Sequence, residues 1–332
     1  MHLCSQRLWS RRAILTAGVG LVAGCRAANG PPPLRLHILK NSVPSVWVRR
    51  FHRRYALDVA TQPQQTDLQA QLAKPDPPDV LTLGLAWLPQ VQAERKLSPW
   101  QPKNLTRWRE LPPQWQKVGS TQNQLWWVPY RWGTTALAYR RDQLTWQPED
   151  WASLWRPELR QRVSAIAQFR ELLALCFLRL GRSINTPAPW PLLELKAQLQ
   201  ALHQQIRLYS DSHYLQPLVL GDVVMAVGWS SDLLALAQRY PEIQVVMPPG
   251  STIWADGWVL PAGKSMSRVA TAWVNFCWEP EQLASLETQG LAWSPFAPQL
   301  QQYEFYRPLN PATQAAYAAL RRWWLALSPV TP

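Results

Sequence analysis

The chain has 332 residues, a length that predicts about two domains. Hydrophobic residues make up 47% and charged residues 17%, which excludes a disordered chain because so much apolar surface can form packed cores. The 34 basic residues exceed the 21 acidic ones and give a net charge of +13. These basic residues are scattered, without a long basic run, a zinc-ligand spacing or an RNA-binding aromatic motif. We therefore expect no nucleic-acid partner.

Residues 1–24 have the composition of a signal peptide. Arg7, Arg11 and Arg12 precede an apolar stretch that is too short to span a bilayer as a stable helix. The run Val-Ala-Gly before Cys25 resembles a bacterial lipobox, in which the cysteine becomes the lipidated first residue. A chance cysteine after an ordinary signal is the alternative. The Arg-Arg pair also resembles a twin-arginine export signal, and the choice between the Sec and twin-arginine routes stays open.

Residues 25–33 follow as a lipidated cysteine and a proline-rich tether. We therefore expect a lipid-anchored protein in the periplasm or on another extracytoplasmic membrane face. Loss of the signal removes three arginines and no acid, which lowers the net charge from +13 to +10. Two further cysteines, Cys176 and Cys277, lie in apolar helical contexts and are expected to be buried thiols; whether they pair stays open.

From residue 34 onward, strand-like and helix-like segments alternate, which favours α/β layers. Alternating apolar residues predict strands over 34–38 and 57–61, with a short helix over 46–55 between them. Compact apolar runs at 80–83 and 223–227 predict buried parallel strands. Three amphipathic stripes predict helices over 192–206, 269–277 and 317–327, where the apolar residues serve core packing.

Catalytic signatures are missing from the sequence. It contains no nucleophile elbow, no phosphate-binding loop and no dinucleotide-binding glycine motif. The five histidines never stand at a metal-ligand spacing. We therefore expect no catalytic residue, no metal and no cofactor, and the chain is not predicted to be an enzyme. A tryptophan-lined glycan-degrading enzyme is the alternative, and it would need two carboxylates about 5–10 Å apart.

Five short motifs follow one another in a fixed order over most of residues 34–300. They are Val128–Thr135 with its Pro-Tyr-x-Trp-Gly run, Trp151–Glu158, Gly228–Asp232, Trp254–Gly257, and Asn275–Phe276 in a helix that Glu279–Pro280 ends. In this order they resemble the polyamine-binding members of the periplasmic solute-binding protein family. Those proteins are the extracytoplasmic receptors of ABC importers for spermidine and putrescine.

The resemblance implies a type II periplasmic-binding-protein fold, which has two α/β lobes and a ligand cleft between them. Lobe 1 would comprise residues 34–130 and 253–302, and lobe 2 would comprise residues 131–252 and 303–332. The chain would cross between the lobes near 129–134 and 249–254, and the C-terminal helix would pack on lobe 2. The resemblance further implies a monomer that delivers a small cationic polyamine to ABC permease subunits.

The same resemblance implies a set of ligand contacts, because the family surrounds the aliphatic chain with aromatic rings and binds the ammonium groups with carboxylates. Carboxylates suit ligand ammonium groups, since a charge-assisted hydrogen bond contributes about 1.5–3 kcal/mol to binding. A tryptophan face adds about 0.5–2 kcal/mol by cation–π attraction. The residues carried over are Trp229 and Asp232, Trp254 and Asp256, the acidic contact Glu171, and Trp293 at a position where the family can place a tyrosine.

Four of these residues could instead have a purely structural role. Asp232 could cap a helix over 233–239, and Glu171 could be an exposed acid in a first helical turn. Trp229 and Trp254 could be ordinary core residues. Asp256 has the weakest structural alternative and is therefore the strongest candidate.

Several positions depart from the family, so the lobe 1 half of the site lacks residue types that contact the ligand in the family. The family's aromatic contacts near residues 41–44 are missing here, as are a serine, a tyrosine and a second acid elsewhere. The residues found instead are Leu39, Ser42, Gly84, Ala86 and Gln168. Trp87 or Trp47 could compensate, and the identity of the ligand stays open.

Two further functions use the same fold. An anionic solute would be favoured if arginines gathered in the cleft, and the candidates are Arg131, Arg140, Arg141 and Arg170. An exported scaffold protein that has lost transport would be favoured if tryptophan rings filled the cleft.

Overall fold

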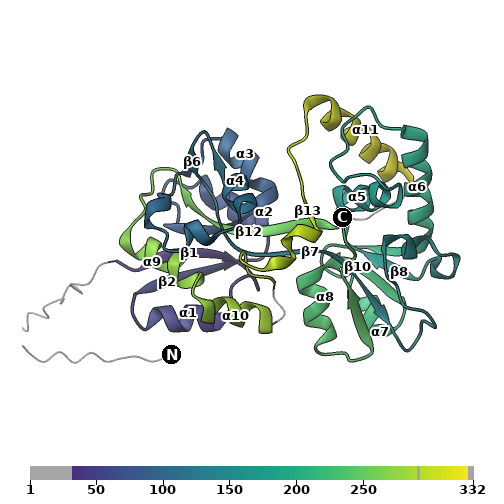
Figure 1. The fold of residues 1–332 in the computed structure, drawn as a ribbon, viewed down its shortest axis with the longest axis horizontal. Coiled ribbons are helices and arrows are strands. Elements are labelled where there is room, and N and C mark those ends of the chain that lie inside the picture. The colour runs from purple at the N-terminus through teal and green to yellow at the C-terminus, as the bar shows by residue number, and fades with distance from the viewer. Residues whose placement is uncertain (1–31, 290–291, 328–332) are drawn as a thin grey trace, which may run out of the picture. The chain divides into compact units, whose positions relative to one another are not determined.

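The computed structural model describes residues 32–289 and 292–327 (Figure 1). From Pro33 onward the chain forms one compact unit. The predicted signal peptide, Cys25 and most of the tether lie outside the described residues. Within those ranges, no helix has both the length and the apolar character needed to cross a membrane.

Helices and strands alternate along the chain, as the sequence predicts for an α/β protein. The strands are β1 (Leu34–Leu39), β2 (Leu57–Gln62), β3 (Val80–Gly84), β4 (Leu97–Ser98), β5 (Ser120–Thr121), β6 (Gln124–Leu125), β7 (Val128–Arg140), β8 (Val163–Ala165), β9 (Ile206–Tyr209), β10 (Met225–Trp229), β11 (Ile243–Val246), β12 (Thr252–Pro261) and β13 (Glu304–Phe305). The α-helices are α1 (Ser45–His52), α2 (Gln65–Leu72), α3 (Leu88–Ala93), α4 (Pro113–Val118), α5 (Phe169–Arg179), α6 (Leu192–Gln205), α7 (Gln216–Leu220), α8 (Ser230–Ala237), α9 (Arg268–Cys277), α10 (Pro280–Thr288) and α11 (Pro311–Leu327).

The predicted elements are present with small shifts at their ends. α1 ends three residues before the predicted 55, because the chain turns at Arg53 and Arg54. β3 and β10 occupy the two apolar runs expected to be parallel strands. β3 pairs in parallel with β1 but antiparallel with β12. β10 pairs in parallel with β8 but antiparallel with β7. The prediction of parallel pairing therefore holds for one of the two neighbours of each strand.

A single sheet runs through the unit in the order β2-β1-β3-β12-β7-β10-β8-β9. At its centre, β7 and β12 lie antiparallel, and Figure 1 shows both passing from one half of the fold into the other. On one side of this pair, β12 continues to the parallel group β3, β1 and β2. On the other side, β7 continues to β10, β8 and β9, and also pairs with β11. The two long strands therefore connect both halves.

Two separate groups of buried side chains flank this central pair. The first core takes its residues from 34–132 and 253–300. The second core takes its residues from 136–246, in two adjoining clusters, together with Leu320 and Trp324 of α11. α11 thus packs on the second core, and the Trp324 ring lies 5.3 Å from that of Phe169.

Most tryptophans serve the first core, which accounts for much of their abundance. The fully buried ones there are Trp47, Trp100, Trp115, Trp127, Trp132, Trp258, Trp273 and Trp278. Cys176 and Cys277 are both buried and free, as expected. They belong to different cores, which explains why they do not pair.

Candidate ligand-binding site

Alternate residues of β7 and β12 form the floor of the candidate site. Successive side chains of a strand point to opposite faces, so positions two apart on adjacent strands share one face. Asp256 pairs with Arg131 in the register, and Trp254 pairs with Gly133. The hydroxyls of Thr135 and Thr252, the next positions on this face, lie 2.8 Å apart. The central strip comprises Arg131, Gly133 and Thr135 of β7 with Thr252, Trp254 and Asp256 of β12.

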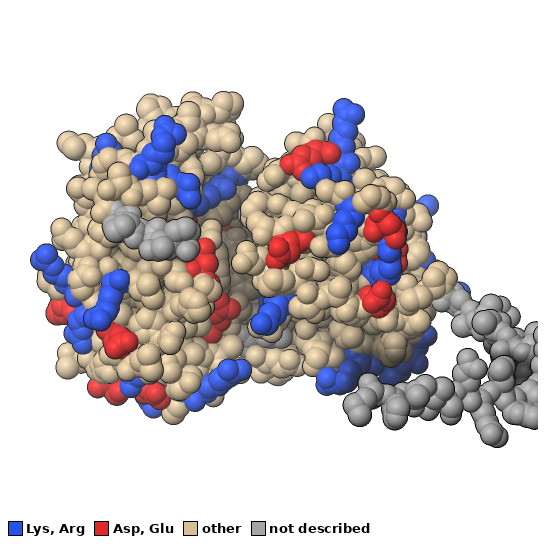
Figure 2. All heavy atoms as spheres, turned by 180° about the vertical axis from the view of Figure 1, so that it is seen from behind, with Lys and Arg blue, Asp and Glu red and all other residues tan. Residues whose placement is uncertain are grey.

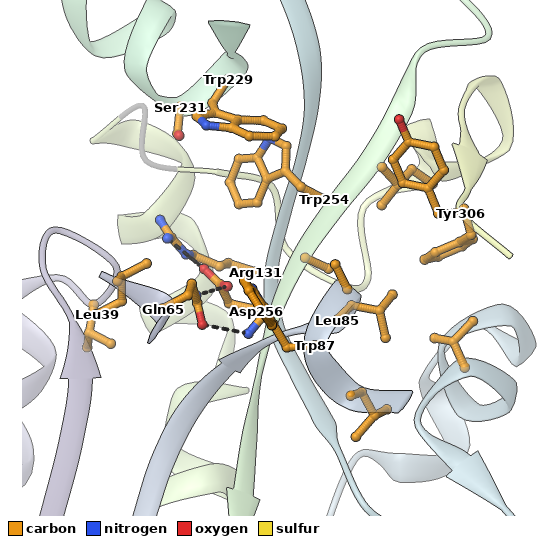
Figure 3. Close-up of a pocket in the computed structure, with 18 of the residues that line it drawn as sticks. Leu39, Gln65, Leu85, Trp87, Arg131, Trp229, Ser231, Trp254, Asp256 and Tyr306 are labelled. Atoms are coloured by element: carbon orange, nitrogen blue, oxygen red, sulfur yellow. Dashed lines mark hydrogen bonds and ion pairs between the residues drawn. The ribbon is translucent and has the colours of Figure 1, made fainter. Parts of the chain in front are cut away.

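A pocket of about 1870 Å³ opens over the central strip. Leu39, Leu85 and Trp87 line it from one side, and Trp229 and Ser231 line it from the other (Figure 3). Asp232 is also among the lining residues. The space-filling view shows the surface hollowed between the two halves, with acidic and basic side chains along the edges (Figure 2). Residues far apart in the sequence therefore meet in one cavity.

Asp256 is bound within the protein by a guanidinium group. Arg131 donates from Nε to the Asp256 Oδ2 atom at 2.8 Å, its Nη2 atom forms an ion pair with the same oxygen at 2.7 Å, and both side chains are buried. Gln65 at the start of α2 donates from Nε2 to Oδ1 at 3.2 Å (Figure 3). The pairing shifts register between Asp256 and Gly257, and such an irregularity re-aims side chains. Both carboxylate oxygens of the strongest sequence candidate therefore already have protein donors.

Trp254 lies across the strip at the position of a glycine. Its ring centre is 5.2 Å from the Arg131 guanidinium carbon, and its Nε1 donates to the Thr134 carbonyl at 3.2 Å. A Cβ at Gly133 would lie 2.3 Å from the Trp254 ring and 2.5 Å from the Ser230 hydroxyl. The absence of a side chain at Gly133 therefore allows Trp254 to line the pocket.

Glu171 closes the other end of the strip. It lies in the first turn of α5, and its Oε2 accepts hydrogen bonds from Thr135 at 2.6 Å and from Thr252 at 2.5 Å. The side chain is buried, which rules out the exposed first-turn acid that the sequence left open. Desolvation raises the pKa of Glu171, and the two threonine hydrogen bonds partly oppose this rise because they favour the charged form.

Replacing Glu171 with glutamine should remove a pH-dependent loss of stability. The pKa of Glu171 in the folded state lies above the ordinary value of 4.5, so the unfolded chain releases this proton first as the pH rises. The stabilising contribution is therefore complete below pH 4.5 and declines up to the folded-state pKa. Urea unfolding of the unmodified protein and of Glu171→Gln from pH 4 upward measures this loss. The same dependence of the unfolding free energy on pH in both proteins would contradict the prediction.

Asp232 presents the more accessible carboxylate of the site. It lies in the first turn of α8, which begins at Ser230, so Trp229 and not Asp232 holds the cap position. Its Oδ2 accepts a hydrogen bond from the Tyr214 hydroxyl at 2.9 Å, and its side chain is exposed. The surrounding protein raises the pKa of Asp232 by desolvation, against the lowering effect of the Tyr214 hydrogen bond. Trp229 is half-buried and lines the same pocket, so it is not an ordinary core residue.

Other residues that the sequence singled out lie in different places. Trp293 exchanges backbone hydrogen bonds of 2.8 and 3.0 Å with Trp132 and packs on its ring at 4.6 Å. Within the described ranges, Trp293 is not among the residues that line the pocket. Of the two tryptophans proposed to compensate, Trp87 lines the pocket, whereas Trp47 is buried and donates to Ser285 at 2.7 Å.

Of the four arginines that would favour an anionic solute, two line the pocket and two do not. Arg131 and Arg170 line the pocket, whereas Arg140 and Arg141 are not among the lining residues that the structure describes. Among the described residues that line the pocket, seven are basic and four are acidic, so the pocket is of mixed charge. These are Lys40, Arg49, Lys117, Arg131, Arg170, Arg239 and Arg307 with Glu171, Asp232, Asp256 and Glu304.

Sequence reasoning missed the supporting residues Gln65, Tyr214, Thr135 and Thr252. The two threonines had a signal, since they continue the alternation of Arg131 and its neighbours along the two central strands. Gln65 and Tyr214 had none, because their contacts join segments far apart in the chain.

Comparison with known proteins decides what kind of pocket this is. Residues 52–317 match the bacterial extracellular solute-binding proteins. The chain belongs to this family. Over 281 residues it is 22% identical to the spermidine/putrescine-binding periplasmic protein of Salmonella typhimurium, covering 82% of this chain and 80% of the relative.

Solved structures agree on the fold. The spermidine/putrescine substrate-binding protein PotD of Streptococcus pneumoniae superimposes with a TM-score of 0.80 at 18% identity, covering 89% of this chain and 99% of the other. The TpPotD lipoprotein of Treponema pallidum gives a TM-score of 0.75 at 17% identity, with 88% and 99% covered.

These matches confirm the family resemblance and the two-lobe α/β fold that the sequence implied. The chain is therefore an extracytoplasmic solute-binding protein and not an enzyme, and an ABC transporter is its partner.

Proposed function

We propose that this protein captures a polyamine-type cation, resembling spermidine or putrescine, and delivers it to the ABC permease. The observation that carries the proposal is the accessible carboxylate of Asp232 in the same pocket as the rings of Trp229, Trp254 and Trp87. A protonated amine needs an ionised acceptor, and its methylene chain needs an apolar wall. The names of the curated relatives, which specify spermidine and putrescine, support the same ligand class.

The expected interactions suffice for useful affinity. A charge-assisted hydrogen bond contributes about 1.5–3 kcal/mol, and each tryptophan face contributes about 0.5–2 kcal/mol. Burial of the methylenes adds to these, so micromolar affinity, about 8 kcal/mol, is within reach after ordering costs.

Binding also calls for movement of the two lobes. The pocket of about 1870 Å³ exceeds the roughly 300–1,000 Å³ typical of small-molecule sites. We therefore propose hinge closure about the two central strands, between a lobe of residues 34–130 and 253–302 and a lobe of residues 131–252 and 303–332. Closure would bring Trp87 toward Trp229 and surround the ligand.

Replacing Asp232 with asparagine should abolish stabilisation by polyamines. A ligand at 100 times its Kd adds about 2.7 kcal/mol to the free energy of unfolding, which raises the Tm by several degrees. We expect such a shift for the chain from residue 26 with about 1 mM putrescine, spermidine or spermine, and its loss in Asp232→Asn because the ammonium acceptor is neutral. Differential scanning fluorimetry measures both.

Asp222→Asn is the matched control. Asp222 is exposed in the same half of the protein and is not among the described residues that line the pocket, so this variant should keep the full shift. No shift of the unmodified chain with any of the three amines would overturn the polyamine proposal.

We further propose that Cys25 carries the lipid that holds the protein on the membrane. The lipobox-like sequence before Cys25 supports this, and the name of the Treponema pallidum neighbour describes that protein as a lipoprotein. Cys25→Ser should move the protein from the membrane fraction to the soluble extracytoplasmic fraction, whereas Cys4→Ser should leave it membrane-bound. Immunoblots of the two fractions measure this, and unchanged membrane association of Cys25→Ser would contradict it.

An anionic solute is the second candidate, because basic side chains outnumber acidic ones along the described lining. Addition of small organic acids and sulfonates to the same thermal panel tests it. A scaffold without a ligand has less support, since a wide cavity remains between the tryptophan rings.

A further inference from the structure

The Arg131 guanidinium lies where the family resemblance implies a ligand ammonium group, between the Trp254 face and the Asp256 carboxylate. We infer that Arg131 determines specificity by filling this cationic position, so that the preferred ligand is an aliphatic amine whose far end carries a carboxylate. The inference rests on the proposed function, because it assumes that the pocket takes an aliphatic amine.

The Asp256 carboxylate is buried and already has protein partners at both oxygens. Oδ2 accepts a hydrogen bond from Arg131 Nε and forms an ion pair with Nη2, and Oδ1 accepts a hydrogen bond from Gln65. A ligand ammonium would have to displace a buried guanidinium, and removal of one partner of a buried ion pair is strongly unfavourable. The second ammonium of a diamine would therefore meet a cation at this end of the strip.

The same guanidinium offers a donor to the pocket. Arg131 Nε and Nη2 bind Asp256, whereas Nη1 makes no hydrogen bond to any residue that the structure describes. Figure 3 shows the guanidinium end of Arg131 reaching toward the side of the pocket that carries Ser231. Guanidinium groups bind carboxylates with good geometry, and such charge-assisted hydrogen bonds are strong. An anionic group at this end would gain a partner where an ammonium would be repelled.

The opposite wall retains one acceptor for a single ammonium group. Asp232 is exposed to the pocket, close in the chain to the Trp229 ring, and keeps its carboxylate oriented through Tyr214. Glu171 is less suited, because it is buried and its Oε2 already accepts two threonine hydrogen bonds. The exposed carboxylate of Asp232 and the available guanidinium nitrogen of Arg131 line the same pocket, and this pair describes a site for an ω-amino carboxylate.

Arg131 is the x of the Pro-Tyr-x-Trp-Gly run, whose other residues carry the resemblance. The resemblance therefore sets no residue type at this position, and the guanidinium found here is a feature of this chain's own pocket.

Isothermal titration of the chain from residue 26, which contains the whole compact unit, tests the inference with ligands of matched length. The pairs are 4-aminobutanoate against putrescine and 5-aminopentanoate against cadaverine. We expect each amino acid to bind at least about tenfold more tightly than its diamine, which corresponds to about 1.4 kcal/mol. In Arg131→Gln the preference should reverse, because the carboxylate partner is lost and the Asp256 carboxylate is released for an ammonium.

Two more variants keep the test decisive. Arg170→Gln removes the same charge from the same pocket, but Arg170 donates to the Arg307 carbonyl and is not paired with Asp256. This variant should therefore prefer the amino acid over the diamine as strongly as the unmodified chain does. Arg131→Gln combined with Asp256→Asn removes both members of the pair without leaving a buried charge, so it should fold even if Arg131→Gln alone does not. This double variant should bind the amino acid and the diamine about equally.

The outcomes separate the inference from the function beneath it. Diamine affinity equal to or above amino acid affinity in the unmodified chain overturns the inference and leaves the polyamine proposal intact. A preference that persists in the double variant also overturns it. Absence of binding by both ligand types overturns the proposed function and the inference together.

Discussion

Asp256→Asn should lower the free energy of unfolding by about 3–5 kcal/mol, because it leaves the Arg131 guanidinium buried without its counter-charge. The ion pair is 2.7 Å long, with side-chain exposures of 8% and 6%. Low exposure excludes the water that would otherwise solvate the remaining arginine. Urea unfolding at neutral pH measures the loss, and the Tm should fall by several degrees.

Asp142→Asn is a matched control for this prediction. Asp142 pairs with Arg140 at 2.8 Å, but 45% of its side chain is exposed, and such surface pairs contribute about 0–1 kcal/mol. Replacing both members of the buried pair, as Arg131→Met with Asp256→Leu, should recover most of the stability, since no buried charge is left. A loss in Asp256→Asn as small as that in Asp142→Asn would contradict the buried ion pair.

Gly133→Ala should weaken ligand binding by at least about tenfold and destabilise the fold by about 1–3 kcal/mol. The new methyl group would lie 2.3 Å from the Trp254 ring and 2.5 Å from the Ser230 hydroxyl, so at least one of these groups must move. Movement of Trp254 would break its hydrogen bond to the Thr134 carbonyl and remove an aromatic wall of the pocket.

Titration calorimetry with the tightest ligand of the panel and urea unfolding measure the two effects. Gly84→Ala is the control, because Gly84 also lines the pocket but its added methyl would meet Gln65 and Trp87 at an ordinary 3.4 Å. Equal affinities for Gly133→Ala and Gly84→Ala would show that Trp254 does not depend on the glycine opposite it.

The sequence predicts local structure well where one periodicity dominates. Leu34, Leu36 and Ile38 alternate and form β1, and the stripe over 192–206 forms α6. Two of the ordered motifs, Val128–Thr135 and Trp254–Gly257, lie in β7 and β12, the strands that carry the central strip, although the sequence predicted only that the chain crosses between lobes there.

What the sequence could not supply was the pairing between distant segments. Arg131 and Asp256 are 125 residues apart, and they meet because the pairing of β7 with β12 places them opposite each other. The resemblance therefore assigned Asp256 to the ligand, whereas the structure gives its oxygens to Arg131 and Gln65. Glu171 illustrates the same limit, because a first-turn acid is ordinarily solvated and its burial here depends on threonines from both central strands.

The position of β12 also has a consequence for the order in which the chain folds. β12 inserts between β3 and β7, although about a hundred residues of the second core separate it from β7 in the sequence. A chain synthesised from its N-terminus can form the second core, apart from the part that α11 supplies, before β12 is available, whereas the first core requires β12 as its middle strand. Such non-local pairing is slow, and it leaves the facing edges of β3 and β7 unprotected in the meantime. The ligand site is thus among the last features to form, and capture of a solute can begin only after β12 has joined the sheet.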